Sequence, residues 1–142
     1  MRFCKASPGE ILVCRLEHKS DLLDSLKDFA AERGVSSGFF FMIGAVARAR
    51  FSYYDQAGRK YVEETVDKPM EVLSCVGNVA KFKGDTVVHA HIVVSDYEGK
   101  LRGGHLVSGT EVFAGEVFLV RLEEAVLERE YDEVTGLNQF RV

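Results

Sequence analysis

Three of the four histidines in the chain lie within a window of 17 residues, and imidazole is the commonest metal-binding side chain in proteins. One residue separates His89 from His91, and 13 residues separate His91 from His105. In a β-strand the residues i and i+2 point to the same face, so His89 and His91 are expected to be neighbours. Three convergent imidazoles with one open position form catalytic zinc sites. The spacing therefore predicts a site for zinc or another divalent metal ion.

A structural role is the alternative interpretation of the same histidines, because imidazoles also hydrogen-bond to backbone or carboxylate groups. The apolar Val88, Ala90 and Ile92 alternate with them. This alternation places the core on the opposite face of the strand and the histidines on a polar face, in a pocket or at a subunit seam. No other segment has this density of ligand-type side chains, which favours a functional site. His18 stands alone and is expected at the surface or at a cap.

Other candidates for chemistry carry weaker signals. Glu111 and Glu116 could act as acid or base beside a metal ion, although charge on a strand face is the commoner reason for such residues. We keep Glu116 as the candidate catalytic residue. The glycines between Gly99 and Gly109 form no GxGxxG pattern, and no serine lies in a GxSxG motif.

The elements that must position these residues are mostly strands. Residues Glu10 to Glu17 are short, apolar and rich in strand-forming residues, which predicts a first strand. An amphipathic helix follows, with Ser20 or Asp21 as its N-cap and Gly34 as its stop. It is the one main helix that the sequence predicts.

After Gly34 the sequence becomes β-branched and aromatic, with turn residues at regular intervals. The further predicted strands are Phe39–Ile43, Ala45–Tyr54, Lys60–Val66, Met70–Val76, Thr86–Ser95 and Gly115–Leu122, with predicted turns at 55–58, 77–78, 83–85 and 96–99 and with 120–131 either strand or helix. Short turns between consecutive strands favour antiparallel pairing. The predicted class is α+β, a mostly antiparallel sheet with one main amphipathic helix, in a single domain over residues 1–142.

Composition limits the classes of function. The chain has 142 residues, 46% hydrophobic and 28% charged, with a net charge of −4. This balance is typical of a globular protein and argues against the simplest nucleic-acid binder, which needs clustered Lys and Arg. The N-terminus lacks the apolar region of a signal peptide, and no apolar stretch is long enough to span a membrane. We therefore expect a cytoplasmic protein with no membrane partner.

Taken together, several short motifs resemble the PPC domain, the plants-and-prokaryotes conserved domain. The motifs are Leu73 to Val79, His89-Ala90-His91, Gly103 to Leu106 with Gly109, Glu116-Val117, and the closing Arg129, Asp132 and Thr135 to Leu137. The resemblance spans essentially the whole chain. It implies a helix packed on an antiparallel sheet and assembly as a homotrimer. Plant members carry AT-hooks and act in nuclear regulation through protein interaction, and bacterial and archaeal members are often labelled DNA-binding.

This chain lacks the Arg-Gly-Arg-Pro hook and is acidic, so the minor-groove contacts of the hook have no residues to make them. A more distant similarity is to acetolactate decarboxylase, whose zinc is held by an HxH pair and a third histidine. His89, His91 and His105 match that pattern.

The leading hypothesis is a stand-alone PPC-domain protein, a cytoplasmic homotrimer with a zinc or other divalent metal ion on His89, His91 and His105. It would act in a regulatory or binding role, with a protein partner or a small-molecule ligand. The alternative is a metal-dependent lyase for a small oxo- or hydroxy-acid, in which Glu116 moves a proton. Whether the protein is an enzyme stays open at this point. Direct DNA binding is the third hypothesis, and the net charge of −4 argues against it.

Overall fold

The computed structural model describes residues 1–142 and contains one α-helix and nine β-strands. The helix is α1 (Leu22–Glu32). The strands are β1 (Ser7–Arg15), β2 (Gly38–Asp55), β3 (Lys60–Val66), β4 (Met70–Phe82), β5 (Asp85–Ser95), β6 (Leu101–Leu106), β7 (Glu111–Glu123), β8 (Arg129–Asp132) and β9 (Leu137–Phe140).

Seven strands form one sheet in which all paired strands are antiparallel. The order is β1-β7-β2-β4-β5-β6, and β3 pairs with β2 outside this path. Strand β6 pairs with β5 and also with β2, so β2, β4, β5 and β6 close into a ring. Strands β8 and β9 form a separate hairpin. The predicted class, a mostly antiparallel sheet with one main helix, is confirmed.

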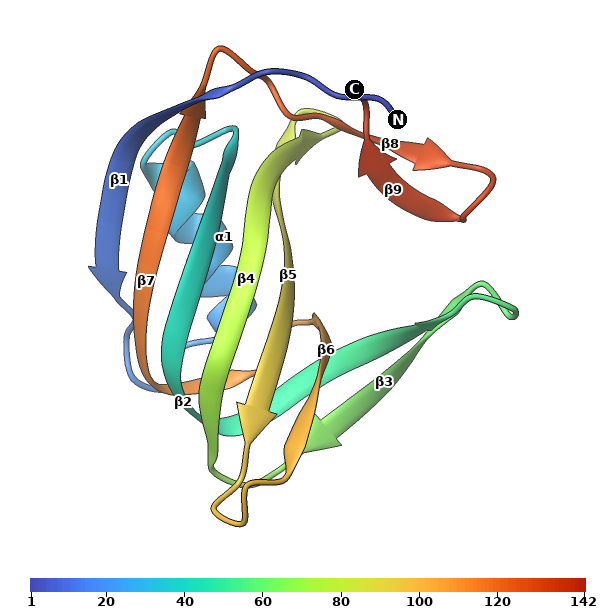
Figure 1. Ribbon diagram of the computed structural model, residues 1–142. Coiled ribbons are helices and arrows are strands. Elements are labelled where there is room, and N and C mark those ends of the chain that lie inside the picture. The colour runs from blue at the N-terminus through green and yellow to red at the C-terminus, as the bar shows by residue number, and fades with distance from the viewer.

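Helix α1 lies against one face of this sheet (Figure 1). Asp21 is its N-cap, because a side-chain oxygen of Asp21 accepts a hydrogen bond of 3.0 Å from the backbone N–H of Asp24. The helix ends at Glu32, Arg33 is its C-cap, and Gly34 follows with a φ of 65°. A left-handed residue after the last turn is the stop that the sequence predicts, since glycine adopts this conformation without a steric cost.

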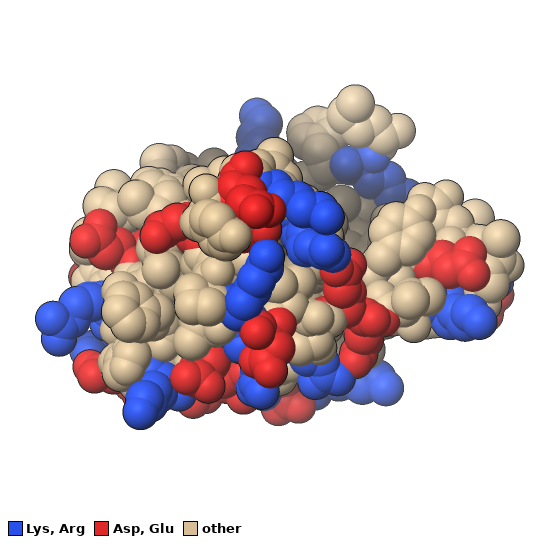
Figure 2. Space-filling view, turned by 90° about the horizontal axis from the view of Figure 1, so that it is seen from below, with Lys and Arg blue, Asp and Glu red and all other residues tan.

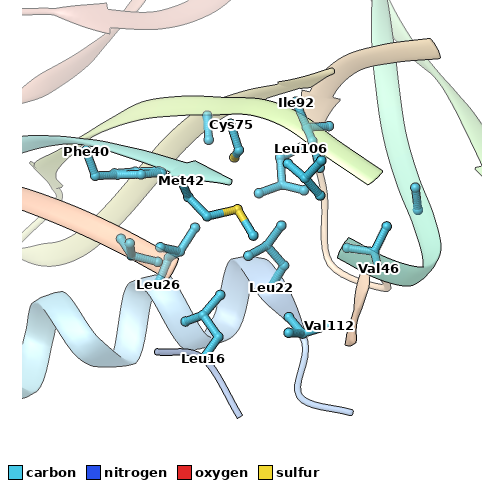
Figure 3. Packing of buried hydrophobic residues seen from close by; sticks show 14 of the residues in the cluster. Leu16, Leu22, Leu26, Phe40, Met42, Val46, Cys75, Ile92, Leu106 and Val112 are labelled. Atoms are coloured by element: carbon cyan, nitrogen blue, oxygen red, sulfur yellow. The ribbon is translucent and has the colours of Figure 1, made fainter. Parts of the chain in front are cut away.

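The core fills the space between α1 and the sheet. Leu22 and Leu26 of the helix point toward Met42 of β2, and Ile92 and Leu106 lie above them (Figure 3). All five side chains are at most 3% exposed. Burying each such side chain contributes roughly 1.5–3 kcal/mol to stability. The strand face that carries Ile92 is therefore fixed toward the helix, and the next residues along β5 must face the other way.

Strand β2 is continuous where the sequence predicts two strands, Phe39–Ile43 and Ala45–Tyr54. Gly44 has a φ of 151° and lies where the register with β4 shifts, so a bulge bends the strand instead of ending it. The first part of β2 pairs with β7 and β4, and its second part pairs with β3. The second part and β3 form an arm that leaves the sheet (Figure 1).

The predicted turn at Gly77–Asn78 is wrong, because β4 runs through both residues and pairs them with Ala90 and His89. Glycine there serves a close approach to β5: an added Cβ at Gly77 would lie 2.5 Å from the carbonyl oxygen of His89 and 2.8 Å from the Cβ of Ala90. The glycine and asparagine are therefore strand residues, which local turn statistics do not reveal.

The C-terminal third also differs from the prediction. The segment 120–131 is neither one strand nor one helix, because β7 ends at Glu123 and Glu124 turns the chain with a φ of 62° before β8 begins. Strand β6 lies within the glycine-rich segment 99–109, where the sequence analysis placed no strand. Strand β9 was not predicted, because its four residues are too short for a clear periodicity.

The β2–β3 arm and the β8–β9 hairpin project on the same side of the sheet, beyond β5 (Figure 1). Side chains of the arm join the two. The guanidinium of Arg59 donates hydrogen bonds of 3.2 and 3.1 Å to the carbonyls of Glu133 and Val134, and the hydroxyl of Tyr54 donates one of 2.8 Å to the carbonyl of Thr135. The arm is thus tied to the turn of the hairpin, and the two enclose a space over β4, β5 and β6.

The sheet face turned away from α1 carries a row of exposed apolar side chains. Phe41 pairs in register with Phe118 on β7 and with Val76 on β4, and Val76 pairs with His91 on β5. The rings of Phe41 and Phe118 stack with centroids 5.0 Å apart, yet Phe41 is 47% exposed. Ile43 is also exposed. A contiguous row of exposed apolar side chains on a sheet is typical of an interaction surface.

Charged residues of both signs alternate on the face seen from below in Figure 2, where Lys and Arg lie beside Asp and Glu. A phosphate-binding surface would instead gather one sign of charge. No helix in the structure has the length and hydropathy to cross a membrane.

The close approach at Gly77 predicts the effect of a single added methyl group. Gly77→Ala should lower the free energy of unfolding by about 1–3 kcal/mol, the usual cost of overpacking, because the new Cβ meets strand backbone that cannot move aside cheaply. Urea denaturation measures this change. Gly9→Ala is the matched control, since its Cβ would meet only the flexible side chain of Glu123. Equal denaturation midpoints for the wild type and the Gly77 variant would contradict the packing described here.

Candidate metal centre

The three clustered histidines converge within one chain. His89 and His91 lie on β5, and His105 lies on β6 directly across from His91 in the strand pairing. The ring centroids are 4.8 Å apart for His89 and His105, 5.2 Å for His89 and His91, and 5.7 Å for His91 and His105. One nitrogen from each ring can be chosen so that all three lie within 4.8 Å of one another. The same-face geometry that the HxH spacing predicts is present.

Two features of the local sequence produce this convergence. Ala90 and Ile92 are 2% and 1% exposed in the core, so the alternating histidines must face outward. Gly103 and Gly104 let β6 approach its neighbours, because a Cβ at Gly104 would lie 2.6 Å from the carbonyl oxygen of Ser52, and one at Gly103 would collide with the carbonyl of Ile92. This close approach of the backbones holds His105 beside the other rings.

Burial controls the protonation of two of these rings. Desolvation, followed by repulsion from His105, Arg129 and His91, lowers the pKa of His89 from its ordinary value of 6.5 to about 4. Desolvation is also the main cause that lowers the pKa of His105, with charge on His91 and Arg129 adding to it. His89 and His105 are consequently neutral near pH 7. A neutral imidazole has a free lone pair, which is the form that binds metal ions.

A partly buried arginine adjoins the histidines. Nη2 of Arg129, on β8, donates a hydrogen bond of 2.7 Å to Oδ1 of Asn78 and lies 3.1 Å from Nδ1 of His89. Nη1 donates to the carbonyl of Asn138 at 2.8 Å, and the guanidinium lies 4.5 Å from the ring centroid of Phe140. Burial lowers the pKa of Arg129, while Tyr61 opposes that shift. No carboxylate pairs with this guanidinium among the ion pairs of the structure.

Two tyrosines of the β2–β3 arm lie near the histidines. The ring of Tyr61 lies 5.4 Å from that of His105, and the ring of Tyr54 lies 5.0 Å from that of Tyr61. Burial is the largest cause that raises the pKa of Tyr61, Tyr54 adds to it and Arg129 counteracts it. Tyr61 is therefore a phenol at neutral pH, able to donate a hydrogen bond toward the histidine side of the cavity.

These groups surround a cavity of about 780 Å³ between the arm, the hairpin and the sheet. Its lining includes His89, His91, His105 and Arg129, together with residues of the arm and the hairpin. None of its 18 lining residues is Asp or Glu. The cavity therefore offers imidazole, guanidinium, amide and phenol groups, which suit a metal ion and an anionic or carbonyl-bearing ligand.

The other candidates from the sequence lie elsewhere. Glu116 is exposed on β7 and is separated from β5 by β2 and β4, about 14 Å at the usual strand spacing. The structure therefore does not bring Glu116 to the histidines within one chain. The ring of His18 contacts Phe113 edge-on, and its Nδ1 lies 3.0 Å from the carbonyl oxygen of Phe113, away from the cluster.

Sequence reasoning missed Arg129, Asn78 and the tyrosines as parts of this site. Arg129 appeared there only within the closing motif of the family resemblance, and Asn78 was assigned to a turn. Their place in the cavity depends on the β8–β9 hairpin folding back over the sheet, where Lys81 of β4 forms a bridge with Glu128. No local sequence pattern predicts this contact between the hairpin and the sheet.

The chemistry of the three imidazoles fits a zinc ion. Zinc takes neutral imidazole ligands at about 2.0–2.1 Å, which places tetrahedral ligand atoms about 3.3 Å apart. The separations of up to 4.8 Å between the candidate nitrogens exceed this spacing, so the rings must turn inward when a metal binds. Rotation about the side-chain dihedral angles of the histidines can supply such movement.

Comparison with known proteins places the chain in a family. The sequence model of the Plants and Prokaryotes Conserved (PCC) domain matches residues 4–123. A crystallised metal-containing protein from Archaeoglobus fulgidus is 35% identical, with a TM-score of 0.94 and 100% of both chains covered. A candidate DNA-binding protein from Bacteroides thetaiotaomicron is 25% identical, with a TM-score of 0.84, and 95% of this chain and 96% of the other are covered.

More remote similarities extend the comparison. Acetolactate decarboxylase from Bacillus subtilis subspecies spizizenii is 12% identical, with a TM-score of 0.59 over 89% of this chain and 58% of the other, which shows a shared fold alone. Among curated proteins, the bifunctional protein GlmU of a Synechococcus strain is 27% identical over 95% of this chain. The chain spans only 21% of the length of that relative. The family match and the solved structures agree with the resemblance inferred from the motifs, and the chain belongs to the Plants and Prokaryotes Conserved domain family.

Proposed function

We propose that this protein binds zinc or another divalent transition metal ion through His89, His91 and His105 and uses it as the centre of a ligand-binding cavity in a regulatory role. The observation that carries the proposal is the convergence of the three rings, whose candidate nitrogens lie within 4.8 Å of one another at the cavity. The metal-containing relative from Archaeoglobus fulgidus, at 35% identity over the whole chain, supports the metal-binding part of this proposal.

Binding is proposed ahead of the lyase alternative because of the residues around the cavity. The alternative assigned proton transfer to Glu116, which within one chain lies three strand spacings from β5. The cavity itself has no Asp or Glu in its lining to take over that role. A metal centre with polar neighbours can bind a ligand without a general base beside it.

The surface charge favours a regulatory partner other than bare DNA. The net charge is −4, and the face in Figure 2 mixes both signs. The candidate DNA-binding relative shares the fold and 25% of its residues, but a duplex would need clustered cations on the surface. A small-molecule ligand in the cavity or a protein partner fits the observed surface better.

We also propose that the whole chain, residues 1–142, is one domain that works in the cytoplasm as a homotrimer. The exposed row of Phe41, Phe118, Val76 and Ile43 supports self-association, because burying it removes apolar surface from water. Cyclic association covers the same patch on every copy without leaving an open end. His91 continues this row, so the interface would lie next to the metal centre.

Removing a single imidazole tests the metal site. The purified wild type, stripped with a chelator and reloaded, is expected to hold one zinc per chain by elemental analysis. His89→Ala, His91→Ala and His105→Ala should each lose most of this zinc, because two imidazoles bind far more weakly than three. At free zinc of 100 times Kd, the wild type should gain about 2.7 kcal/mol of stability.

His18→Ala is the matched control for this test, since it removes an imidazole that lies outside the cluster. It should keep full zinc content and the full gain in stability. Zinc content unaffected by the three cluster substitutions would refute the site, as would a wild type that holds far less than one equivalent.

The lowered histidine pKa values predict how stability depends on pH in the metal-free protein. The unfolded chain protonates His89 below its ordinary pKa of 6.5, whereas the folded protein does so only near pH 4. The unfolded state therefore binds more protons in this window, and the free energy of unfolding must fall as the pH drops from 6.5 to 4. Urea titrations across this range should show a shallower fall for His89→Gln. Parallel curves for the wild type and His89→Gln would contradict the burial of a neutral imidazole.

The trimer is tested by solution mass. Light scattering should give three times the chain mass of 15.8 kDa for the wild type, and Phe41→Glu should shift the protein toward monomer. A charge in the middle of an apolar interface leaves an uncompensated desolvation cost, whereas Tyr97→Glu changes a residue that is 92% exposed on a turn and serves as control. A monomeric wild type would rule out the proposed assembly.

A further inference from the structure

Arg129 has more hydrogen-bond donors than partners in the cavity. An arginine carries five N–H donors and no acceptor. Three of them point at Asn78, His89 and Asn138. Nε is buried and has no partner at all. A partly buried guanidinium without a carboxylate and with an orphaned donor is a group that lacks its natural counterpart, since buried charges are normally paired.

The contact between Arg129 and His89 is incompatible with a metal ion on His89. Because arginine can only donate, Nδ1 of His89 must accept, which places the ring proton on Nε2. A neutral imidazole that binds a metal uses one nitrogen for the metal and carries its proton on the other. If Nε2 binds the metal, the proton on Nδ1 faces an N–H donor of Arg129. If Nδ1 binds it, the metal takes the place of the donor. The contact is lost in both cases.

We propose that metal binding releases Arg129 from His89 and makes its guanidinium the anion subsite of the cavity, which then takes a small organic acid. The carboxylate of the acid lies on Arg129, and a second oxygen of the same molecule faces the metal. This inference rests on the proposed metal site at His89, His91 and His105. It assigns the class of ligand and explains why an unpaired arginine is held beside the histidines.

The composition of the cavity selects a carboxylate. A planar guanidinium matches a carboxylate with two parallel hydrogen bonds. No Asp or Glu in the lining competes for Arg129, so the metal ion and the guanidinium together leave the cavity positive. Its hydrophobic wall, which includes Phe82, Val87, Leu137 and Phe140, suits a short hydrocarbon chain. A bare inorganic phosphate would gain nothing from that wall.

Calorimetry with a named pair of probes tests this inference. Zinc-loaded wild type is titrated with 2-oxobutyrate, with its neutral amide, and with inorganic phosphate as a third arm. The same titrations are made on zinc-free protein, on Arg129→Gln and on Arg129→Lys. Arg141→Gln is the matched control, because this arginine lies outside the 780 Å³ cavity and its side chain is 66% exposed. The zinc content of every sample is measured separately.

The expected result is that zinc-loaded wild type binds the acid in preference to the amide and to phosphate. Arg129→Gln should keep its zinc and weaken acid binding about 10- to 100-fold, the effect of losing hydrogen bonds between charged groups, with little change for the amide. Arg129→Lys should recover part of the affinity, since it keeps the charge without the planar fork. Arg141→Gln should match the wild type. Zinc-free protein should bind the acid at least tenfold more weakly.

Different failures point to different parts of the account. A wild type that binds no zinc refutes the proposed function, and the metal-dependent release with it. A wild type that binds zinc and shows equal acid affinity with and without Arg129 refutes only the subsite. Equal affinity of the wild type for acid and amide, or tighter binding of phosphate, also overturns it. These last two comparisons need no variant, so they stand even if Arg129→Gln destabilises the β8–β9 hairpin.

Discussion

Strand β6 is hydrogen-bonded to β5 on one side and to β2 on the other, and this double pairing sets the position of His105 against His91. Two glycines without side chains make the approach sterically feasible, because a Cβ at either would meet backbone of a neighbouring strand. The core residue Ile92 fixes which face of β5 looks outward. The histidine cluster is therefore a consequence of sheet closure and core packing, and it needs no flexible loop to assemble.

The surroundings of the histidine cluster favour the binding of a metal ion and an anion over catalysis by proton transfer. Desolvation keeps His89 and His105 neutral near pH 7, and the cavity lining has no carboxylate. Arg129 adds a positive charge that is satisfied only in part, through amide and carbonyl groups and one imidazole nitrogen. In a partly buried cavity these charges are screened less by water than they would be on the open surface, so they act more strongly on a bound ligand. A metal ion on the histidines and an organic anion on the arginine would satisfy both groups together.

The sequence alone was sufficient for the class of fold and for the histidine cluster, because both depend on short-range patterns. Alternation along β5 predicts that His89 and His91 share a face. The capping residues of the helix are also recognisable in the sequence. The rest depends on long-range contacts. Gly77–Asn78 has the composition of a turn, but pairing with β5 holds it in a strand. Arg129 reaches the cavity only because the hairpin folds back over β4.

X-ray absorption at the zinc edge of the reloaded protein tests the central claim most directly, because it reports the atoms that touch the metal. We predict three imidazole nitrogens at about 2.0–2.1 Å and one further oxygen ligand from solvent or a bound acid. The multiple-scattering pattern of imidazole should weaken when His91 is replaced by alanine. A shell that contains sulfur at about 2.3 Å, or only oxygen atoms with no imidazole signature, would contradict a metal centre on His89, His91 and His105.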